Sequence, residues 1–287
     1  MQLVSFRKAN ASRLGVVVGD SLIDLNQAQP QVPADLGAAL WQGVDLHAAA
    51  KAAVSSNAAH MPLADIEYAA PLVRPGKIIC LGLNYFDHAK EGGREKPDYP
   101  WFFLRGATSL IAHGQVGVRP RVSERFDYEA ELAVVIGVRA RHLSQANALD
   151  CVFGYSCFND MSVRDYQKKT PQWTIGKNFD GTGAFGPVLV TADELTPGAT
   201  GLSIQSRLNG KVMQSANTTD MIWGVAQTIA LLTECMTLEP GDVIIMGTPA
   251  GVGQARTPPV WMKHGDVIDI DIERIGRLSN PIRDEAV

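Results

Sequence analysis

The chain has 287 residues, of which 46% are hydrophobic and 20% charged, with a formal net charge of −4. This composition is typical of a globular protein and excludes disordered and low-complexity classes. The longest basic run is the pair Lys168-Lys169, so we expect no nucleic-acid partner. No apolar run approaches the length of a membrane span and the N-terminus lacks a signal-peptide pattern, which favours a cytoplasmic protein with no membrane partner.

The four cysteines lie within apolar stretches and form no CxxC pair. Such cysteines are more often buried thiols than disulfides or zinc ligands. We therefore expect free, buried thiols at Cys80, Cys151, Cys157 and Cys235.

The first 70 residues differ in pattern from the rest. Strand-like runs at 14–18 and 22–25 flank a Gly19-Asp20 turn, and an Ala-rich stretch at 45–55 predicts a helix. The turn-forming residues Arg74-Pro75-Gly76 follow Pro71. We predict a small N-terminal domain over residues 1–70 and a catalytic domain over 71–287.

Strand patterns dominate after residue 70. Gly-Asp and Asn-Gly turns punctuate them, and the predicted strands are 77–83, 130–137, 187–191, 202–208, 242–246 and 267–272. Helical patterns are fewer, at 142–152, 160–168 and 219–236. Because strands and helices do not alternate regularly, the sequence predicts a β-rich α+β fold and not a doubly wound parallel sheet.

A histidine and a glutamate follow the first of these strands. His88 and Glu91 are three residues apart, a spacing at which a carboxylate can orient an imidazole and raise its basicity. The polar, Gly- and Pro-rich stretch 92–100 that comes next is typical of a mobile lid. The alternative is an exposed helical turn with a solvated His–Glu pair.

Alternating acids mark the strand predicted at 130–137. Side chains alternate faces along a strand, so Asp127, Glu129 and Glu131 share one face at a spacing of about 7 Å. A solvated acidic face would tolerate this row, whereas a partly buried one needs a cation. The apolar run 134–136 indicates a central strand and favours the cation. With only oxygen ligands nearby, Mg²⁺ or Mn²⁺ is expected, and Ca²⁺ less so.

A third acid opens the helix predicted at 160–168. On such a helix Asp160, Arg164 and Gln167 would share one face, which would suit a metal site that also holds an anionic substrate. The alternative is a helix cap with an exposed Asp160–Arg164 ion pair.

Two further segments have the chemistry of anion binding. Lys177 lies among glycines and aromatic residues, where it could hold a carboxylate or a developing oxyanion, or could be a surface-loop lysine. The loop 247–253 could present backbone N–H groups and the Thr248 hydroxyl to an anion. P-loop, dinucleotide-binding, serine-hydrolase and HExxH zinc motifs are absent from the sequence.

Together these segments resemble the fumarylacetoacetate hydrolase family. The resemblance runs in order from about residue 71 to 282, and it is specific because several motifs recur with suitable spacing. They are Gly82-Leu83-Asn84-Tyr85 through His88 and Glu91, Tyr128-Glu129-Ala130-Glu131-Leu132, Asn159 to Asp165, Trp173 to Lys177, Leu208-Asn209-Gly210 and Gly247 to Gly253.

The resemblance implies a role for most of the residues singled out above. Glu129, Glu131 and Asp160 match the family's Mg²⁺ or Mn²⁺ ligands, and His88 and Glu91 match a lid pair that activates water. Lys177 matches the lysine that stabilises substrate charge. The positions matching substrate contacts are Arg164, Gln167, Thr248, Tyr85 and Arg105, although Arg105 stands where many relatives have lysine. The family also implies a mixed β-sandwich roll and a homodimer.

The resemblance further implies a small 2-oxo acid as substrate. We expect a metal-dependent hydrolase that cleaves the carbon–carbon bond of a 2,4-dioxo acid, such as an acylpyruvate, and releases pyruvate. The first alternative is an oxaloacetate-type decarboxylase or a decarboxylase/isomerase of aromatic degradation. The second is a non-catalytic Ca²⁺-stabilised β-protein.

Overall fold

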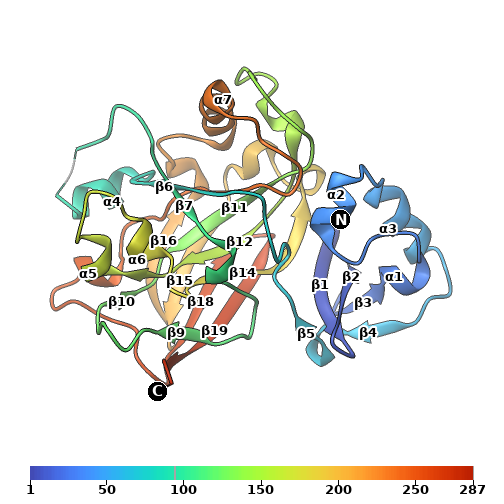
Figure 1. Ribbon diagram of the computed structural model, residues 1–287, viewed down its shortest axis with the longest axis horizontal. Coiled ribbons are helices and arrows are strands. Elements are labelled where there is room, and N and C mark those ends of the chain that lie inside the picture. Colours follow the sequence, from blue (N-terminus) through green and yellow to red (C-terminus); the bar gives the residue numbers. More distant parts are fainter. Residues whose placement is uncertain (94, 287) are drawn as a thin grey trace.

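The computed structural model describes residues 1–93 and 95–286 (Figure 1). In this part of the chain the strands form three sheets, of twelve, five and two strands. The expected β-rich α+β fold is confirmed. Position 94, inside the lid predicted at 92–100, and position 287 lie outside the described residues.

The N-terminal 70 residues form the part drawn in blue in Figure 1. The helix expected at 45–55 is α3, and it begins where the Asp45 carboxylate accepts a hydrogen bond from the Ala48 amide. Strand β1 pairs with β14, so the large sheet continues into this segment, and the boundary at residue 70 stays a prediction. The elements are β1 (Gln2–Lys8), β2 (Ala11–Val18), β3 (Ser21–Asp24), α1 (Leu25–Ala28), α2 (Leu36–Trp41), α3 (Leu46–Val54), β4 (His60–Pro62) and β5 (Glu67–Tyr68).

The large sheet has β11 near its centre. Its main path is β4-β3-β2-β1-β14-β12-β11-β17-β6-β7, with β5 joined to β1 and β8 to β14. Strand β11 is buried along its whole length and runs antiparallel to both β12 and β17. Beyond residue 70 its strands are β6 (Ile78–Gly82), β7 (Trp101–Arg105), β8 (Leu110–Ile111), β11 (Ala130–Ile136), β12 (Val152–Asp160), β14 (Gly183–Thr191) and β17 (Val243–Ile245).

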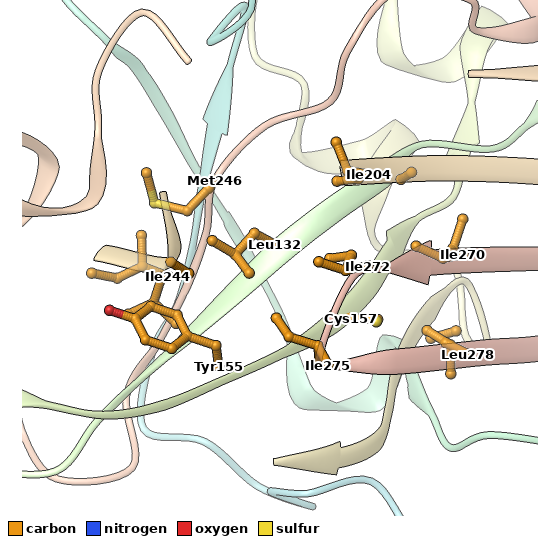
Figure 2. Close-up of a cluster of buried hydrophobic side chains, with 14 of the residues drawn as sticks. Leu132, Tyr155, Cys157, Ile204, Ile244, Met246, Ile270, Ile272, Ile275 and Leu278 are labelled. Carbon is orange, nitrogen blue, oxygen red and sulfur yellow. The ribbon is translucent and has the colours of Figure 1, made fainter. Parts of the chain in front are cut away.

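The five-stranded sheet covers one face of the large sheet. In Figure 2, Ile272 of this sheet lies close to Leu132 of β11. Ile270 and Leu278 of the same sheet and Tyr155 of β12 belong to the same buried cluster. Burial of each such side chain contributes about 1.5–3 kcal/mol to folding, which fixes the sandwich around β11 and β12. The sheet contains β9 (Gly117–Arg119), β15 (Ser203–Leu208), β16 (Lys211–Asn217), β18 (Val267–Ile272) and β19 (Gly276–Asp284), and the two-stranded sheet contains β10 (Phe126–Asp127) and β13 (Ser162–Val163).

Two predicted helices are wrong. Residues 142–152 contain only the short 3₁₀ helix η3 (Ala148–Cys151), because the His142 amide bonds to the Thr233 carbonyl and Asn147 accepts from the Ser144 amide. Within residues 160–168 the helix is limited to the single turn α5 (Arg164–Gln167), and β13 precedes it. Asp160 is instead the last residue of strand β12, where its amide bonds to the Glu129 carbonyl.

A third helix is shorter than predicted. The pattern at 219–236 becomes η6 (Thr218–Asp220) and α7 (Val225–Cys235). The residues between them bond to Asn84 instead of continuing the helix. The Trp223 amide donates to Asn84 Oδ1, and the Ile222 amide donates to the Asn84 backbone carbonyl. The remaining helices are α4 (Phe86–Glu91) and α6 (Thr174–Lys177), and the remaining 3₁₀ turns are η1 (Leu63–Asp65), η2 (Ala107–Ser109), η4 (Ala192–Glu194), η5 (Pro197–Ala199) and η7 (Gly253–Ala255).

The four cysteines are free thiols. Cys80, Cys151 and Cys157 are buried as expected, but the expectation was wrong for Cys235, which is exposed at the end of α7. Across the described residues, we find no helix with the length and apolar character needed to span a membrane.

His113 contacts both β5 and β19. Its Nδ1 accepts a hydrogen bond from the Ser279 amide at 3.1 Å, and its ring meets the Tyr68 ring edge-on at 4.7 Å. Burial lowers the pKa of His113 below its ordinary value of 6.5.

This lowered pKa predicts a loss of stability in acid. As the pH falls below 6.5, the unfolded chain takes up a proton at this position before the folded protein does, so stability decreases. We expect His113→Asn to lose less unfolding free energy between pH 7 and pH 5 than the wild type does, measured by urea unfolding. The control is His142→Asn, at an exposed position with φ 54° that asparagine tolerates. An equal pH dependence in all three proteins would contradict the prediction.

Candidate metal centre and active-site cavity

Three acids meet where β11 and β12 run side by side. Glu129 immediately precedes β11, Glu131 is its second residue and Asp160 ends β12. Because the two strands are antiparallel with Ala130 opposite Asn159, these residues come together, and one carboxylate oxygen of each lies within 4.8 Å of the others. All three are at least 96% buried. We call this group the acidic triad.

Asp127 lies apart from the triad, behind Arg164. Its carboxylate accepts from Arg164 Nε at 2.8 Å and from the amides of Gly253 and Gln254 at 2.7 and 3.0 Å. The strand is interrupted between β10 and β11, so Asp127 does not continue the Glu129–Glu131 row. The solvated acidic face that the sequence left open is not observed, because all four acids are buried.

Three cationic side chains compensate the acids. Lys177 Nζ lies 2.6 Å from both Glu129 Oε2 and Asp160 Oδ2, and Arg164 Nη2 lies 2.7 Å from Glu129 Oε1. Arg105 Nη1 donates to Asp160 Oδ1. Lys177 is therefore not a surface-loop lysine: it is 1% exposed and bridges two members of the triad.

The surrounding charges and burial shift the pKa values of Glu129 and Glu131 in opposite directions. Burial alone would raise the pKa of Glu129, but Arg164 and Lys177 outweigh it and hold the pKa at about 2. Burial raises the pKa of Glu131 well above its ordinary value, and the charges of Asp160 and Glu129 raise it further. For Lys177, burial would lower the pKa, yet the neighbouring carboxylates raise it.

Glu131 is the acid that lacks compensation. Among the described residues its carboxylate accepts one hydrogen bond, from the Gly247 amide at 2.5 Å, and pairs with no cationic side chain. Asp127 and the triad place four carboxylates against Arg105, Arg164 and Lys177, which leaves one negative charge in excess when all four acids are ionised. A buried excess of oxygen-borne negative charge fits a hard divalent cation such as Mg²⁺ or Mn²⁺. The triad could hold such an ion.

The His88–Glu91 pair lies on α4 at the rim of the site. His88 Nδ1 and Glu91 Oε1 are 2.8 Å apart, and since a carboxylate only accepts, Nδ1 carries the proton and Nε2 keeps its lone pair. Glu91 Oε2 in turn accepts from the Gly251 amide at 2.8 Å. Glu91 and the Gly251 amide thus fix the orientation of the imidazole.

A cavity of about 390 Å³ brings most of the predicted site residues together. Its wall also contains Phe103, from an aromatic run that the sequence suggested would shape the pocket, and Trp173, which opens one of the motifs of the resemblance. Of the predicted site residues, those on its wall are His88, Glu91, Glu129, Glu131, Arg164, Gln167, Lys177 and Thr248.

Two predicted substrate contacts are not on the cavity wall. Arg105 is 4% exposed and bonds to Asp160, to Ser109 Oγ at 3.3 Å and to Thr182 Oγ1 at 3.0 Å, so its position supports the triad. Tyr85 is 2% exposed, and its buried hydroxyl has no hydrogen-bond partner within the described part of the chain.

Thr248 faces the cavity as an acceptor. Gln214 Oε1 accepts from the Ala130 amide, so its Nε2 must be the nitrogen that donates to Thr248 Oγ1 at 2.7 Å. The Thr248 hydroxyl hydrogen is bound by the Ala130 carbonyl at 3.0 Å. The hydroxyl therefore offers a lone pair, which suits a ligand hydroxyl or water. Sequence reasoning missed Gln214, which has no motif around it.

The loop 247–254, which we call the amide loop, binds anions that belong to the protein itself. Its amides at Gly247, Gly251 and Gly253 donate to Glu131, Glu91 and Asp127 respectively. The sequence predicted a loop that presents N–H groups to an anion, and the anions are three carboxylates of the site.

Comparison with known proteins identifies a matching family model and similar proteins. Residues 77–283 match the family model described as fumarylacetoacetate (FAA) hydrolase C-terminal. The chain is 38% identical over 288 residues to an oxaloacetate tautomerase, fahd2, of Xenopus laevis, which covers 98% of this chain and 90% of the relative.

Two solved structures match this chain over its full length or nearly so. A fumarylacetoacetate hydrolase from Exiguobacterium antarcticum has a TM-score of 0.86 at 35% identity, covering 99% of this chain and all of that chain. A maleylpyruvate hydrolase from Sphingobium sp. SYK-6, in complex with manganese(II) and pyruvate, has a TM-score of 0.82 at 31% identity, with both chains fully covered.

The uncompensated charge predicts how Glu131→Gln behaves. Mg²⁺ or Mn²⁺ should raise the melting temperature of the wild type by mass action. The variant should bind the ion at least roughly tenfold more weakly. Without metal it should be no less stable than the wild type, because the amide keeps the bond from Gly247 and carries no buried charge. Thermal unfolding with and without chelator, together with calorimetry, measures both effects.

The exposed variant Glu124→Gln is the control, and it should respond to metal as the wild type does. If Glu131→Gln bound Mg²⁺ and Mn²⁺ with wild-type affinity, the triad would not be the metal site.

Proposed function

The chain belongs to the fumarylacetoacetate hydrolase family, and from this premise we propose that it is a metal-dependent tautomerase of a small 2-oxo acid. It would interconvert the keto and enol forms of its substrate. The observation that carries the proposal is the oriented imidazole of His88, which lines the same cavity as two carboxylates of the triad. The tautomerase relative, matched over 98% of this chain, favours proton transfer over carbon–carbon cleavage.

The acidic triad would hold Mg²⁺ or Mn²⁺, which when bound acts as a Lewis acid on the substrate's oxygen atoms. His88 Nε2 then accepts a proton from the carbon next to the 2-oxo group. Glu91 stabilises the imidazolium through the 2.8 Å bond to Nδ1, and Gly251 keeps Glu91 in place. His88 returns the proton to the oxygen, so keto and enol forms interconvert with no other reactant.

Other residues of the cavity favour the enol. The lone pair of Thr248 Oγ1 can accept a hydrogen bond from the enol hydroxyl, which a keto group could not supply. Arg164 and Lys177 contribute positive potential beside the substrate's carboxylate. Phe103 and Trp173 exclude water from one wall.

Hydrolysis of a 2,4-dioxo acid is the second candidate. The maleylpyruvate hydrolase structure with manganese and pyruvate supports it. In that reaction His88 would take its proton from water, and the water oxygen would attack the carbonyl carbon of the bond that breaks. The products would be pyruvate and a second carboxylic acid, whereas a decarboxylase would release CO₂ and pyruvate.

Product analysis separates these reactions. The purified protein with Mg²⁺ would be assayed on oxaloacetate, acetylpyruvate and fumarylpyruvate. Tautomerase activity predicts faster decay of the enol absorbance of oxaloacetate with no pyruvate released above the uncatalysed rate. Stoichiometric pyruvate and a second acid from an acylpyruvate would establish the hydrolase instead. Calcium binding without turnover of any 2-oxo acid would favour the non-catalytic alternative.

If His88 is the general base, His88→Gln should lose catalytic activity but keep its affinity for the metal. The variant should lose on the order of 10²–10⁴-fold in kcat, because general-base catalysis contributes about that much. Mn²⁺ affinity should stay unchanged, since His88 is not part of the triad. Steady-state kinetics and metal-binding calorimetry test both points.

Asp87→Asn is the matched control, because Asp87 lies beside His88 on α4 but is exposed. It should keep wild-type kcat. Wild-type turnover by a metal-loaded His88→Gln protein would remove the imidazole from the mechanism.

A further inference from the structure

A closed ring of three hydrogen bonds joins Ala130, Gln214 and Thr248 beside the acidic triad. The Ala130 amide donates to Gln214 Oε1 at 3.0 Å, and Gln214 Nε2 donates to Thr248 Oγ1 at 2.7 Å. The Thr248 hydroxyl closes the ring by donating to the Ala130 carbonyl at 3.0 Å. Each of the three residues is at most 2% exposed. Ala130 itself lies between Glu129 and Glu131 of the triad.

The ring stands where a strand would otherwise continue. Strand β17 ends three residues before Thr248, and its register with β11 would place Thr248 opposite Ala130 if the strand went on. At Gly247 the backbone turns away with a φ of 86°, a left-handed conformation that glycine adopts without strain. The side chains of Gln214 and Thr248 therefore bind the Ala130 N–H and C=O in place of a neighbouring strand.

A β-bulge aims Gln214 into this position. The pairing of β15 with β16 shifts register after Ser206 and skips Met213. The extra residue interrupts the alternation of the strand, so Met213 and Gln214 are both buried although they are neighbours. In a regular strand one of these two side chains would face the other side of the sheet. Bulges of this kind often re-aim a side chain at a functional site.

The partners of Gln214 fix the direction of its amide. The Ala130 N–H can only donate, and the Pro249 carbonyl, which lies 2.7 Å from Gln214 Nε2, can only accept. The group that faces Thr248 is therefore the NH₂ group. Gln214 and the Ala130 carbonyl then engage one lone pair and the hydrogen of the Thr248 hydroxyl, which leaves a lone pair for the cavity.

We propose that Gln214 is a positioning residue that makes the site selective for a ligand hydroxyl at Thr248, and hence for the enol form of the substrate. This inference rests on the proposed function for the reaction itself. Among the described residues that line the cavity, Thr248 is present and Gln214 is not, so Gln214 acts through Thr248. Once the ring is broken, the Thr248 hydroxyl can turn its hydrogen toward a keto oxygen, and the discrimination is lost.

Gln214→Met and Gln214→Leu test this role by kinetics at saturating Mn²⁺. Initial rates would be measured from the enol form and from the keto form of oxaloacetate. We expect KM for the enol to rise about threefold to tenfold, which corresponds to the loss of one hydrogen bond. KM for the keto form should stay within about twofold. Because the overall equilibrium cannot change, kcat from the keto form should fall by the same factor as KM for the enol rises. An equal rise of both KM values, or a rise in neither, would contradict the proposal.

A double-mutant cycle with Thr248 shows whether Gln214 acts through the hydroxyl. Thr248→Val should raise KM for the enol at least as much as Gln214→Met does, and Thr248→Ser, which keeps the hydroxyl, should raise it less. The double variant Gln214→Met/Thr248→Val should be no worse than Thr248→Val alone. Effects that multiply in the double variant would mean that Gln214 acts by another route, and the proposal would fail.

Gln205→Met is the matched control. Gln205 is a glutamine of the neighbouring strand β15, but its side chain bonds to Ser215 and Arg207, away from the ring. This variant should change neither KM value.

Ligand binding separates this inference from the proposed function. Lactate has a hydroxyl where pyruvate has a keto oxygen, and calorimetry on the Mn²⁺-loaded protein gives the affinity for each. The ratio of lactate to pyruvate affinity should fall about threefold to tenfold in Gln214→Met and in Thr248→Val, and should stay unchanged in Gln205→Met. An unchanged ratio in Thr248→Val would overturn the inference even if the Gln214 variants failed to fold.

The two kinds of measurement then give distinct outcomes. A protein that shows the fall in ratio but turns over no 2-oxo acid keeps the role of Gln214 and loses the tautomerase. A protein that turns over oxaloacetate, with the ratio and both KM values unchanged in the Gln214 variants, keeps the tautomerase and loses the role of Gln214.

Discussion

The structure depends on keeping three carboxylates together in the interior. Glu129, Glu131 and Asp160 repel one another strongly at low dielectric, and their oxygens lie within 4.8 Å. Lys177 and two arginines offset part of this repulsion, and the central position of β11 and β12 in a sandwich core resists the rest. The fold thus maintains an arrangement that is unfavourable without a cation, which is why the same residues would bind one.

The amide loop connects this charge cluster to the His88–Glu91 pair. Its backbone amides hold Glu131, Glu91 and Asp127, so one segment positions the cation site, the His88 imidazole and the Arg164 guanidinium. Only glycine lets the backbone of this loop pack so closely against the neighbouring chain. A Cβ at Gly251 would lie 2.4 Å from the Met213 carbonyl oxygen, and one at Gly253 would lie 1.9 Å from that of Val260. The glycine-rich sequence therefore reflects close packing against these carboxylates and their neighbours.

Sequence patterns predicted the parts of the site that depend on local geometry. Strand alternation placed Glu129 and Glu131 on one side, and the three-residue spacing placed Glu91 against His88. Strand β12 was missed, because it is buried on both sides and its polar residues break any alternation, so Asp160 was assigned to a helix. The pairing of Lys177 with Glu129 joins residues 48 positions apart, and that of Gln214 with Thr248 joins residues 34 apart. Only the three-dimensional pairing of strands brings such residues together.

The separation of charge across the cavity suggests how one fold can serve several reactions. The buried end holds the triad and its three cations, and under the proposed function it would bind the 2-oxo acid group that all these reactions share. Under the proposed function His88, on α4 at the rim, takes its proton from carbon in a tautomerase and from water in a hydrolase. Arg125 and Lys168 are exposed and lie outside the packed core, so a substitution there leaves the buried charges undisturbed. Reaction type can therefore change at the rim while the costly buried cluster stays the same.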